Sequence, residues 1–137
     1  MLLRDTLDVQ KQVLGETHIG TLVTLLNLAK VAFDRGEFEA AAAEYDVVAR
    51  SFAEFHPDHF LGAIALNMQG RTLTQLDDFA AADVALESAY DKFNGLFGPA
   101  DSRTRQSITS LIELHERSGE LDKLNHWRGM AGSEPEE

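Results

Sequence analysis

The five histidines of this chain are its best candidates for acid–base or metal chemistry, and two of them flank Asp58 within two residues. His56, Asp58 and His59 lie within four residues, and two imidazoles with a carboxylate can bind a divalent metal. No further ligand framework accompanies them, and Pro57 is a residue that stops a helix. We therefore interpret this segment as a junction between helices and predict no metal site.

Motifs of other enzyme classes are absent from the sequence. It contains no Gly-x-Ser-x-Gly turn, no Gly-x-x-x-x-Gly-Lys phosphate loop and no Gly-x-Gly-x-x-Gly. It also has no cysteine, which excludes thiolate metal sites and cysteine nucleophiles. Asp77 and Asp78 fall in a tight turn and are interpreted as capping and solvated charge. We predict no catalytic residues, no cofactor and no enzymatic activity.

The charge balance limits the kinds of partner. Among 137 residues, 12 are Lys or Arg and 23 are Asp or Glu, which gives a formal net charge of -11. Nucleic acid and anionic membranes are poor partners for such a chain, because binding phosphate requires a basic face. No apolar run is long enough to span a bilayer, and the first residues do not resemble a signal peptide. We expect a cytoplasmic protein.

The elements that must position any site are helices. Apolar residues recur at helical spacing from end to end, and the three prolines and ten glycines argue against a β-rich fold. We predict an all-α fold of seven helices: a leading helix at 2–14 and helix pairs at 18–55, 58–97 and 101–131. Residues 132–137 lack apolar side chains and are predicted to be a disordered tail. Asp58 or Asp101 can cap the helix that follows it.

Three segments of the chain share one layout. The turns inside the three pairs, at Gly36, Asp77 and Gly119, stand 41 and 42 residues apart. A fixed period of this size is typical of stacked helical units. Small residues, Ala29 and Gly70 in the first helices and Ala41 and Ala82 in the second, stand where paired helices must cross closely.

With these residues, the chain resembles the tetratricopeptide repeat (TPR) family over about residues 2–131. The positions that carry the resemblance are large and small apolar residues in two repeats, Leu25, Leu28, Ala29, Ala32, Ala41 and Tyr45, then Leu66, Gly70, Leu73, Ala82, Leu86 and Ala89. The third repeat departs from the pattern at Ile112, His115 and Leu124, as a capping repeat does. The resemblance implies a short right-handed α-solenoid.

The repeat length points to one subtype of that family. The period exceeds the usual 34 residues, and the junctions at 14–18, 56–59 and 97–99 are similar to the leucine-glycine-x-x-histidine-proline links of the kinesin-light-chain subtype. The resemblance implies longer helices than in an ordinary repeat. It also implies that the histidines of the junctions serve capping and packing.

The resemblance implies a concave groove lined by the first helix of each pair. Lys30 and Arg71 each follow the small residue of their repeat, so they occupy equivalent places. The family uses groove Asn and basic residues to hold peptides, so we expect a protein or peptide ligand, with an acidic segment as one candidate. Alternatively, these cations only pair with Asp34, Gln75 or Glu113 and keep the surface soluble. The candidate partner-binding residues are Asn27, Lys30, Asp34, Asn67, Arg71, Thr74, Gln75, Ser110, Glu113 and Arg117, with Gln106 and Thr109 beside them.

The leading interpretation is a non-catalytic protein–protein interaction scaffold that binds a peptide segment of a partner. The alternative is a self-association unit, or a fragment of a longer repeat array attached to a signalling protein. Residues 113–119 with Trp127 and Arg128 resemble the last repeat of arrays appended to some bacterial serine/threonine kinases. Trp127 is expected to close the end of the stack, with an exposed partner anchor as the other interpretation.

The leading helix raises the question of self-association. Residues 2–14 match the second helix of a repeat whose first helix is not in this chain. Leu3, Leu7, Val13 and Leu14 should then be only partly covered by the helix at 18–35. Two copies could cover them in a homodimer, or an upstream helix of a longer array could do so.

Overall fold

The computed structural model describes residues 2–15 and 17–132, and each regular element in this part of the chain is an α-helix. The prediction of an all-α fold with seven helices is confirmed. Residues 133–137 of the predicted tail lie outside the described residues, and Gly132 is the last residue of a helix. The helices are α1 (Leu2–Val13), α2 (Ile19–Asp34), α3 (Phe38–Phe55), α4 (Phe60–Gln75), α5 (Phe79–Phe97), α6 (Ser102–Ser118) and α7 (Leu121–Gly132).

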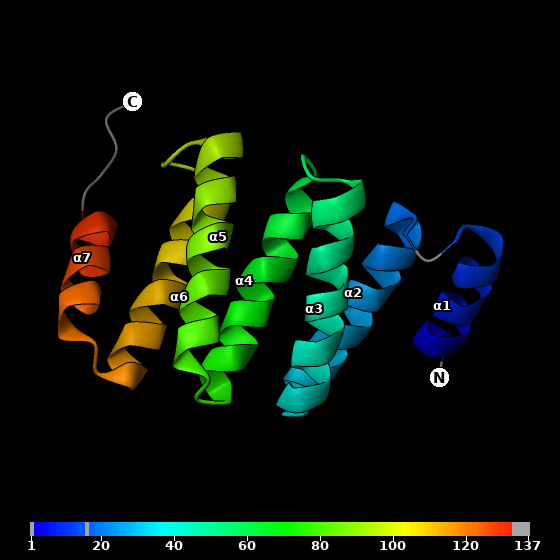
Figure 1. Cartoon of the computed structure of the whole chain (residues 1–137), viewed down its shortest axis with the longest axis horizontal. Helices are drawn as coiled ribbons and strands as arrows, with labels where there is room; N and C mark the ends of the chain where they lie inside the picture. Colours follow the sequence, from blue (N-terminus) through cyan, green and yellow to red (C-terminus); the bar gives the residue numbers. More distant parts are fainter. Residues whose placement is uncertain (1, 16, 133–137) are drawn as a thin grey trace.

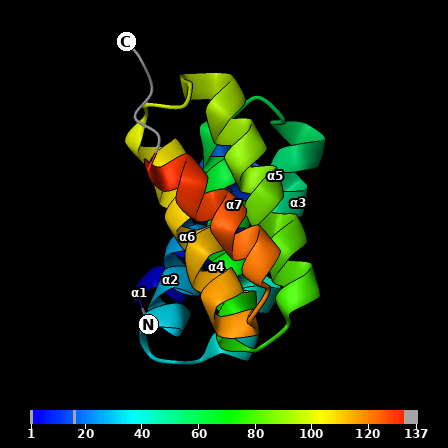
Figure 2. The same cartoon turned by 90° about the vertical axis from the view of Figure 1, so that its left-hand side faces the viewer.

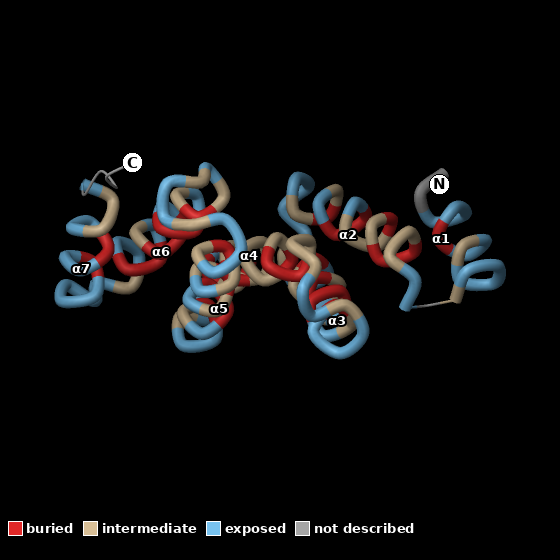
Figure 3. Tube along the Cα trace, turned by 90° about the horizontal axis from the view of Figure 1, so that it is seen from above, coloured by how far each residue is buried: buried red, intermediate tan, exposed pale blue. Residues whose placement is uncertain are grey.

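The helices stand side by side in chain order, from α1 at one end of the molecule to α7 at the other (Figure 1). Seen from above, α2, α4 and α6 follow a curved inner line, and α3 and α5 project on the outer side (Figure 3). Viewed along the row from the C-terminal end, α7 lies in front of α6 and α5 (Figure 2). Each helix packs chiefly on its neighbours in sequence, as in a solenoid.

The three helix pairs begin with equivalent caps. His18, His59 and Asp101 are the N-cap residues of α2, α4 and α6, and their side chains accept the backbone N–H two residues later at 3.0, 3.1 and 2.9 Å. These positions are again 41 and 42 residues apart. The expectation that Asp101 caps a helix is confirmed, whereas Asp58 caps none. The turn after Pro57 runs one residue further, so the imidazole of His59 takes that place.

The turns inside the pairs share a left-handed backbone. Gly36 and Gly119 both have φ near 78°, and Asp77 reaches 59° without being a glycine. Glycine favours this left-handed region of the backbone because glycine has no Cβ. The turns and the caps therefore define one repeat register.

Close helix crossings lie where the small residues predict them. Ala29, Ala41 and Ala82 have no exposed surface. A Cβ on Gly70 would stand 2.4 Å from Leu86 Cγ, which is closer than any real contact. A larger side chain at position 70 would therefore separate α4 from α5.

The two ends of the array are packed differently. At the C-terminal end Trp127 is 6% exposed, and its ring meets that of Tyr90 at 5.0 Å, so it closes the stack as expected. At the other end, Leu7 is fully buried against α2, contrary to the expectation of partial cover. Val13 and Leu14 remain 74% and 44% exposed, and the side chain of Leu3 lies outside the described residues.

Candidate functional site

Two adjoining hollows on the inner layer form what we call the α4–α6 groove. The first has a volume of about 250 Å³ and the second about 530 Å³, and they share Arg71 of α4 and Glu113 of α6. The residues that line them are Asn67, Arg71, Gln106, Thr109, Ser110 and Glu113 in the first, and Phe33, Arg71, Thr74, Gln75, Glu113, Glu116 and Arg117 in the second.

The structure divides the predicted site residues into two sets. Those from the second and third repeats line the groove, but Asn27, Lys30 and Asp34 of α2 line neither hollow. Among the described residues, helix α2 reaches the groove only through Phe33. Glu116 is a lining residue that sequence reasoning missed, although it lies one helical turn after Glu113.

The equivalent cations Lys30 and Arg71 have different surroundings. Lys30 Nζ pairs with Asp34 one turn later at 3.1 Å, and both side chains are more than half exposed. The Arg71 guanidinium instead lies 5.3 Å above the Phe33 ring, with Nη1 3.4 Å from Met68 Sδ. Within the described residues Arg71 forms no ion pair, so its charge is available to a ligand.

Two polar atoms near Arg71 are buried without a hydrogen-bond partner. They are the side-chain oxygen of Asn67 and the hydroxyl of Tyr45. Burial, followed by the Asp34 carboxylate, raises the pKa of Tyr45 to about 12, while Arg71 acts in the opposite direction. Tyr45 is therefore a neutral hydroxyl at physiological pH.

Other polar groups of the groove are already engaged. Arg117 Nε donates to Asp77 at 2.8 Å, and Arg128 donates to Glu116 at 3.0 Å. The hydroxyls of Thr74 and Ser110 donate to carbonyls of their own helices at 2.8 and 3.1 Å. Glu113 forms no ion pair within the described part of the chain. The groove thus offers a guanidinium, an amide and a carboxylate that are free to bind.

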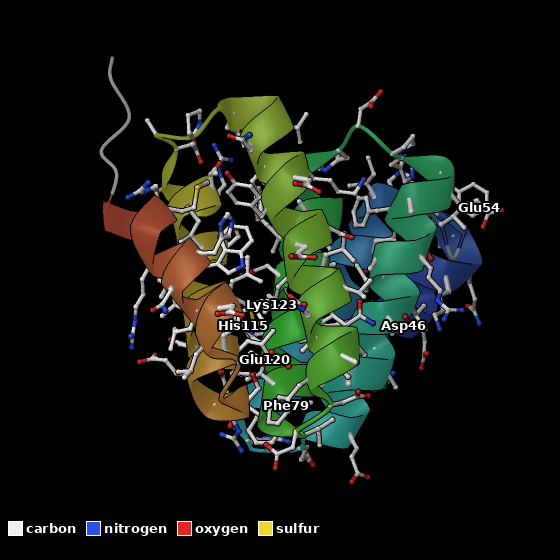
Figure 4. All side chains as sticks on the ribbon, turned by 60° about the vertical axis from the view of Figure 1, so that its left-hand side comes forward. Asp46, Glu54, Phe79, His115, Glu120 and Lys123 are labelled. Atoms are coloured by element: carbon white, nitrogen blue, oxygen red, sulfur yellow. The ribbon has the colours of Figure 1, made fainter. Side chains whose placement is uncertain are left out.

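A second cluster of titratable groups joins the last three helices. The 2%-exposed His115 of α6 has Nε2 3.4 Å from Asp83 Oδ1 of α5, and Lys123 Nζ of α7 lies 2.6 Å from the other oxygen of Asp83. Figure 4 shows His115 and Lys123 together with Glu120 and Phe79 between α5 and α7. Burial lowers the pKa of His115, so the ring is neutral at physiological pH.

Among the described residues of this cluster, only Lys123 is hydrogen-bonded to Asp83, and the nearby Ser118 hydroxyl is directed to the backbone carbonyl of His115. His115 Nε2 approaches the other oxygen of Asp83 at 3.4 Å, but both ring nitrogens of His115 are buried without a hydrogen-bond partner. At the junction before α4, His56 Nε2 contacts the Thr17 carbonyl at 2.8 Å, so this imidazole also has a structural contact. The described residues contain no group of three or more His, Cys, Asp or Glu that could hold a metal ion.

None of the helices in residues 2–15 and 17–132 is long and apolar enough to cross a bilayer.

Comparison with known proteins supports the fold. No protein-family model matches this chain, and no curated protein matches it. The structure is similar to the crystal structure of BtubC (BKLC) from P. vanneervenii, with a TM-score of 0.76 and 20% sequence identity. The match covers 81% of this chain and 44% of BtubC, so the chain spans less than half of that protein. Since BtubC is a TPR-like helical protein, the likeness supports a TPR-like helical repeat fold.

Proposed function

We propose that this TPR-like helical repeat is a non-catalytic interaction module that binds an extended peptide segment of a partner in the α4–α6 groove. One observation carries the proposal. Asn67 and Arg71 line the same hollow, and within the described residues the amide of Asn67 makes no hydrogen bond and the charge of Arg71 has no ion-pair partner.

The chemistry of these groups favours a peptide with acidic side chains. An Asn amide can accept from a peptide N–H and donate to a peptide C=O. Arg71 presents a planar guanidinium suited to a carboxylate, while Glu113 can accept a hydrogen bond from a backbone or side-chain donor. Lys30 contributes less than its place in the repeat predicts, because Asp34 neutralises it.

The long-repeat, kinesin-light-chain-like subtype is part of the same proposal. Its support is the spacing of 41 and 42 residues shared by caps and turns, together with the histidine caps at two of the junctions. The similarity to BtubC (BKLC) agrees with this assignment at the level of the fold.

A selection experiment tests the groove. A random library of peptides is selected on the intact chain, and the enriched peptides are measured against Arg71→Gln and Asn67→Ala variants by fluorescence anisotropy. We expect enrichment in Asp and Glu, and a loss of about tenfold in affinity for each variant, since one charged or buried hydrogen bond is removed. Lys30→Gln is the matched control and should bind like the wild type.

Two results would contradict this function. One is that selection yields no peptide with measurable affinity. The other is that no enriched peptide binds the Arg71→Gln or the Asn67→Ala variant more weakly than it binds the wild type.

Self-association through α1 is a second candidate function. Val9 and Val13 are 58% and 74% exposed on α1, and Leu14 just after it is 44% exposed. Covering such apolar area stabilises an interface by about 25 cal/mol per Å². Light scattering of the intact chain should then show a dimer that Val9→Glu with Val13→Glu dissociates, and a monomer at all concentrations would exclude it.

A further inference from the structure

The outer side of the molecule carries a small apolar pocket that the α4–α6 groove does not include. It lies between α3 and α5, over α4, and has a volume of about 160 Å³. Its apolar walls are Ala49, Phe52 and Ala53 of α3 with Gly62 and Leu66 of α4. In Figure 4, Asp46 of this pocket lies on α3 beside α5, away from the labelled cluster at α7.

Small residues of the repeat create this pocket. A Cβ on Gly62 would stand 3.0 Å from the Cβ of Phe52, so α3 and α4 approach closely at this point. Helix α4 packs on both α3 and α5, and the outer helices project beyond it (Figure 3). The short side chains of Ala49 and Ala53 leave the space between these ridges unfilled.

The volume of the pocket suits one side chain. Pockets for small-molecule ligands usually measure about 300–1,000 Å³, whereas an apolar cavity of about 150 Å³ holds a benzene ring. A single aromatic or branched aliphatic group therefore fills it. Interfaces concentrate their binding energy in such anchors, each seated in a desolvated pocket.

The rim of the pocket favours a carboxylate beside that anchor. Asp46 is already engaged, since Arg50 Nε lies 3.0 Å from one of its oxygens and Gln69 donates to the other at 3.0 Å. Lys92 of α5 forms no hydrogen bond or ion pair with any described residue. His59 accepts the Leu61 N–H at Nδ1, which leaves its Nε2 as the donor in the neutral ring. Local cations are uncommon in a chain of net charge -11, so this rim is complementary to an acidic group.

We propose that the pocket between α3 and α5 is a second docking site, which receives an aromatic or branched aliphatic anchor of a partner protein segment next to an Asp or Glu that pairs with Lys92. The site is separate from the α4–α6 groove and does not depend on it. A module with both sites can hold two segments at once, one on each side of the helix row.

The test uses a chain whose groove is disabled by Asn67→Ala and Arg71→Gln. A random peptide library is selected on this variant, and the enriched peptides are then measured on the wild-type chain. We expect sequences with an aromatic residue or Leu within one helical turn of Asp or Glu. Ala53→Trp, which fills the pocket from an exposed position of α3, should lower the affinity of these peptides at least about tenfold. Lys92→Gln should lower their affinity about tenfold. Lys11→Gln, on α1, is the matched charge control and should leave the affinity unchanged.

A second measurement separates a protein partner from a free small acid. Amide chemical shifts are recorded with 3-phenylpropionate, which joins an aromatic ring to a carboxylate, and with its amide as the uncharged control. Shifts at Ala53, Gly62 and Lys92 with the acid, together with enriched peptides, support the proposal. Shifts with the acid but no enriched peptide would overturn it in favour of a small-molecule site. The proposal would also be overturned if the enriched peptides bound the Ala53→Trp variant as tightly as the wild type. This comparison requires that the circular-dichroism melt of the variant matches that of the wild type.

Discussion

Gly70 shows how one small residue controls the packing of two helices. The nearest atoms to its missing Cβ belong to Leu86 at 2.4 and 2.5 Å and to the Ala82 carbonyl at 3.2 Å, so a methyl group has no room. The sequence predicts this crossing from the repeat pattern alone, because a glycine in mid-helix is otherwise unfavourable.

We predict that Gly70→Ala destabilises the protein although alanine is the better helix former. Overpacking costs about 1–3 kcal/mol, and the helix propensity gained, about 1 kcal/mol, offsets only part of it. Gly95→Ala is the matched control, since nothing lies within 4 Å of its Cβ position in α5, and it should raise the stability by about 0.5–1 kcal/mol. Urea unfolding of the two variants measures both effects. Equal stability changes would show that the crossing is not close.

A second prediction at this scale concerns His115. Burial lowers its pKa in the folded chain, whereas the nearby carboxylates of Asp83, Glu87 and Glu120 raise it and Lys123 lowers it. Because the folded pKa lies below the unfolded value of about 6.5, the neutral ring contributes stability above that pH, and this contribution is lost as the pH falls toward the folded pKa.

Unfolding free energies measured from about pH 7.5 to about pH 5 test this prediction. The wild-type stability should fall with acid, and His115→Leu should fall less steeply. Ile108→Val, a buried substitution in the same helix that removes no titratable group, provides the control and should keep the wild-type slope. A His115→Leu curve parallel to that of the wild type would contradict the lowered pKa.

The sequence could predict which residue types face the groove, but not their individual partners. Helical spacing places Arg71 and Lys30 equivalently, yet Arg71 stacks on Phe33 and Lys30 pairs with Asp34. Their difference depends on where α2 stands relative to α4. That relative position is a property of three-dimensional packing and is not encoded in the spacing of either helix.

At the scale of elements, the junctions between pairs repeat the same contacts. Thr21 Oγ1 donates to the Gly15 carbonyl before α2, and Thr104 Oγ1 donates to the Gly98 carbonyl before α6, both at 2.8 Å. Both threonines are buried, and each ties the start of a helix to the end of the preceding one. In the middle junction, the equivalent position is Gly62, which lines the outer pocket instead.

We predict that Thr104→Val lowers the free energy of unfolding by about 1–3 kcal/mol, because it leaves the Gly98 carbonyl without its partner at nearly constant volume. Thr109→Val, on the exposed face of the same helix, is the control and should change the stability by less than about 0.5 kcal/mol. Thermal melts followed by circular dichroism compare the two variants. A melt of Thr104→Val that coincides with that of Thr109→Val would show that the junction bond is not structural.

The sequence predicts the helices and turns more accurately than it predicts the residue at which each helix begins. The turns at Gly36 and Gly119 are evident from glycine itself, whereas the cap of α4 shifts from Asp58 to His59. Two polar residues in succession can both cap a helix, and the choice depends on where the preceding turn closes. Sequence spacing alone does not fix that position to a single residue.

At the scale of the whole molecule, the row of helices has two unlike sides. The inner layer presents the polar α4–α6 groove, and the outer side presents a small apolar pocket with a cationic rim. The repeat period predicts stacked pairs and therefore an inner and an outer layer. The depth of each hollow depends on the curvature of the stack, which the period does not specify.

Mapping a groove peptide by NMR shows whether it binds the inner faces of α4 and α6. A peptide selected on the Ala53→Trp chain, whose outer pocket is filled, is added to the ¹⁵N-labelled wild-type protein, and amide shifts are recorded for α1 to α7. We expect shifts at the Asn67 side-chain amide and at the backbone of Arg71, Thr109 and Glu113. Shifts confined to α1 or to the outer side of α3 and α5, with the inner faces of α4 and α6 unchanged, would contradict it.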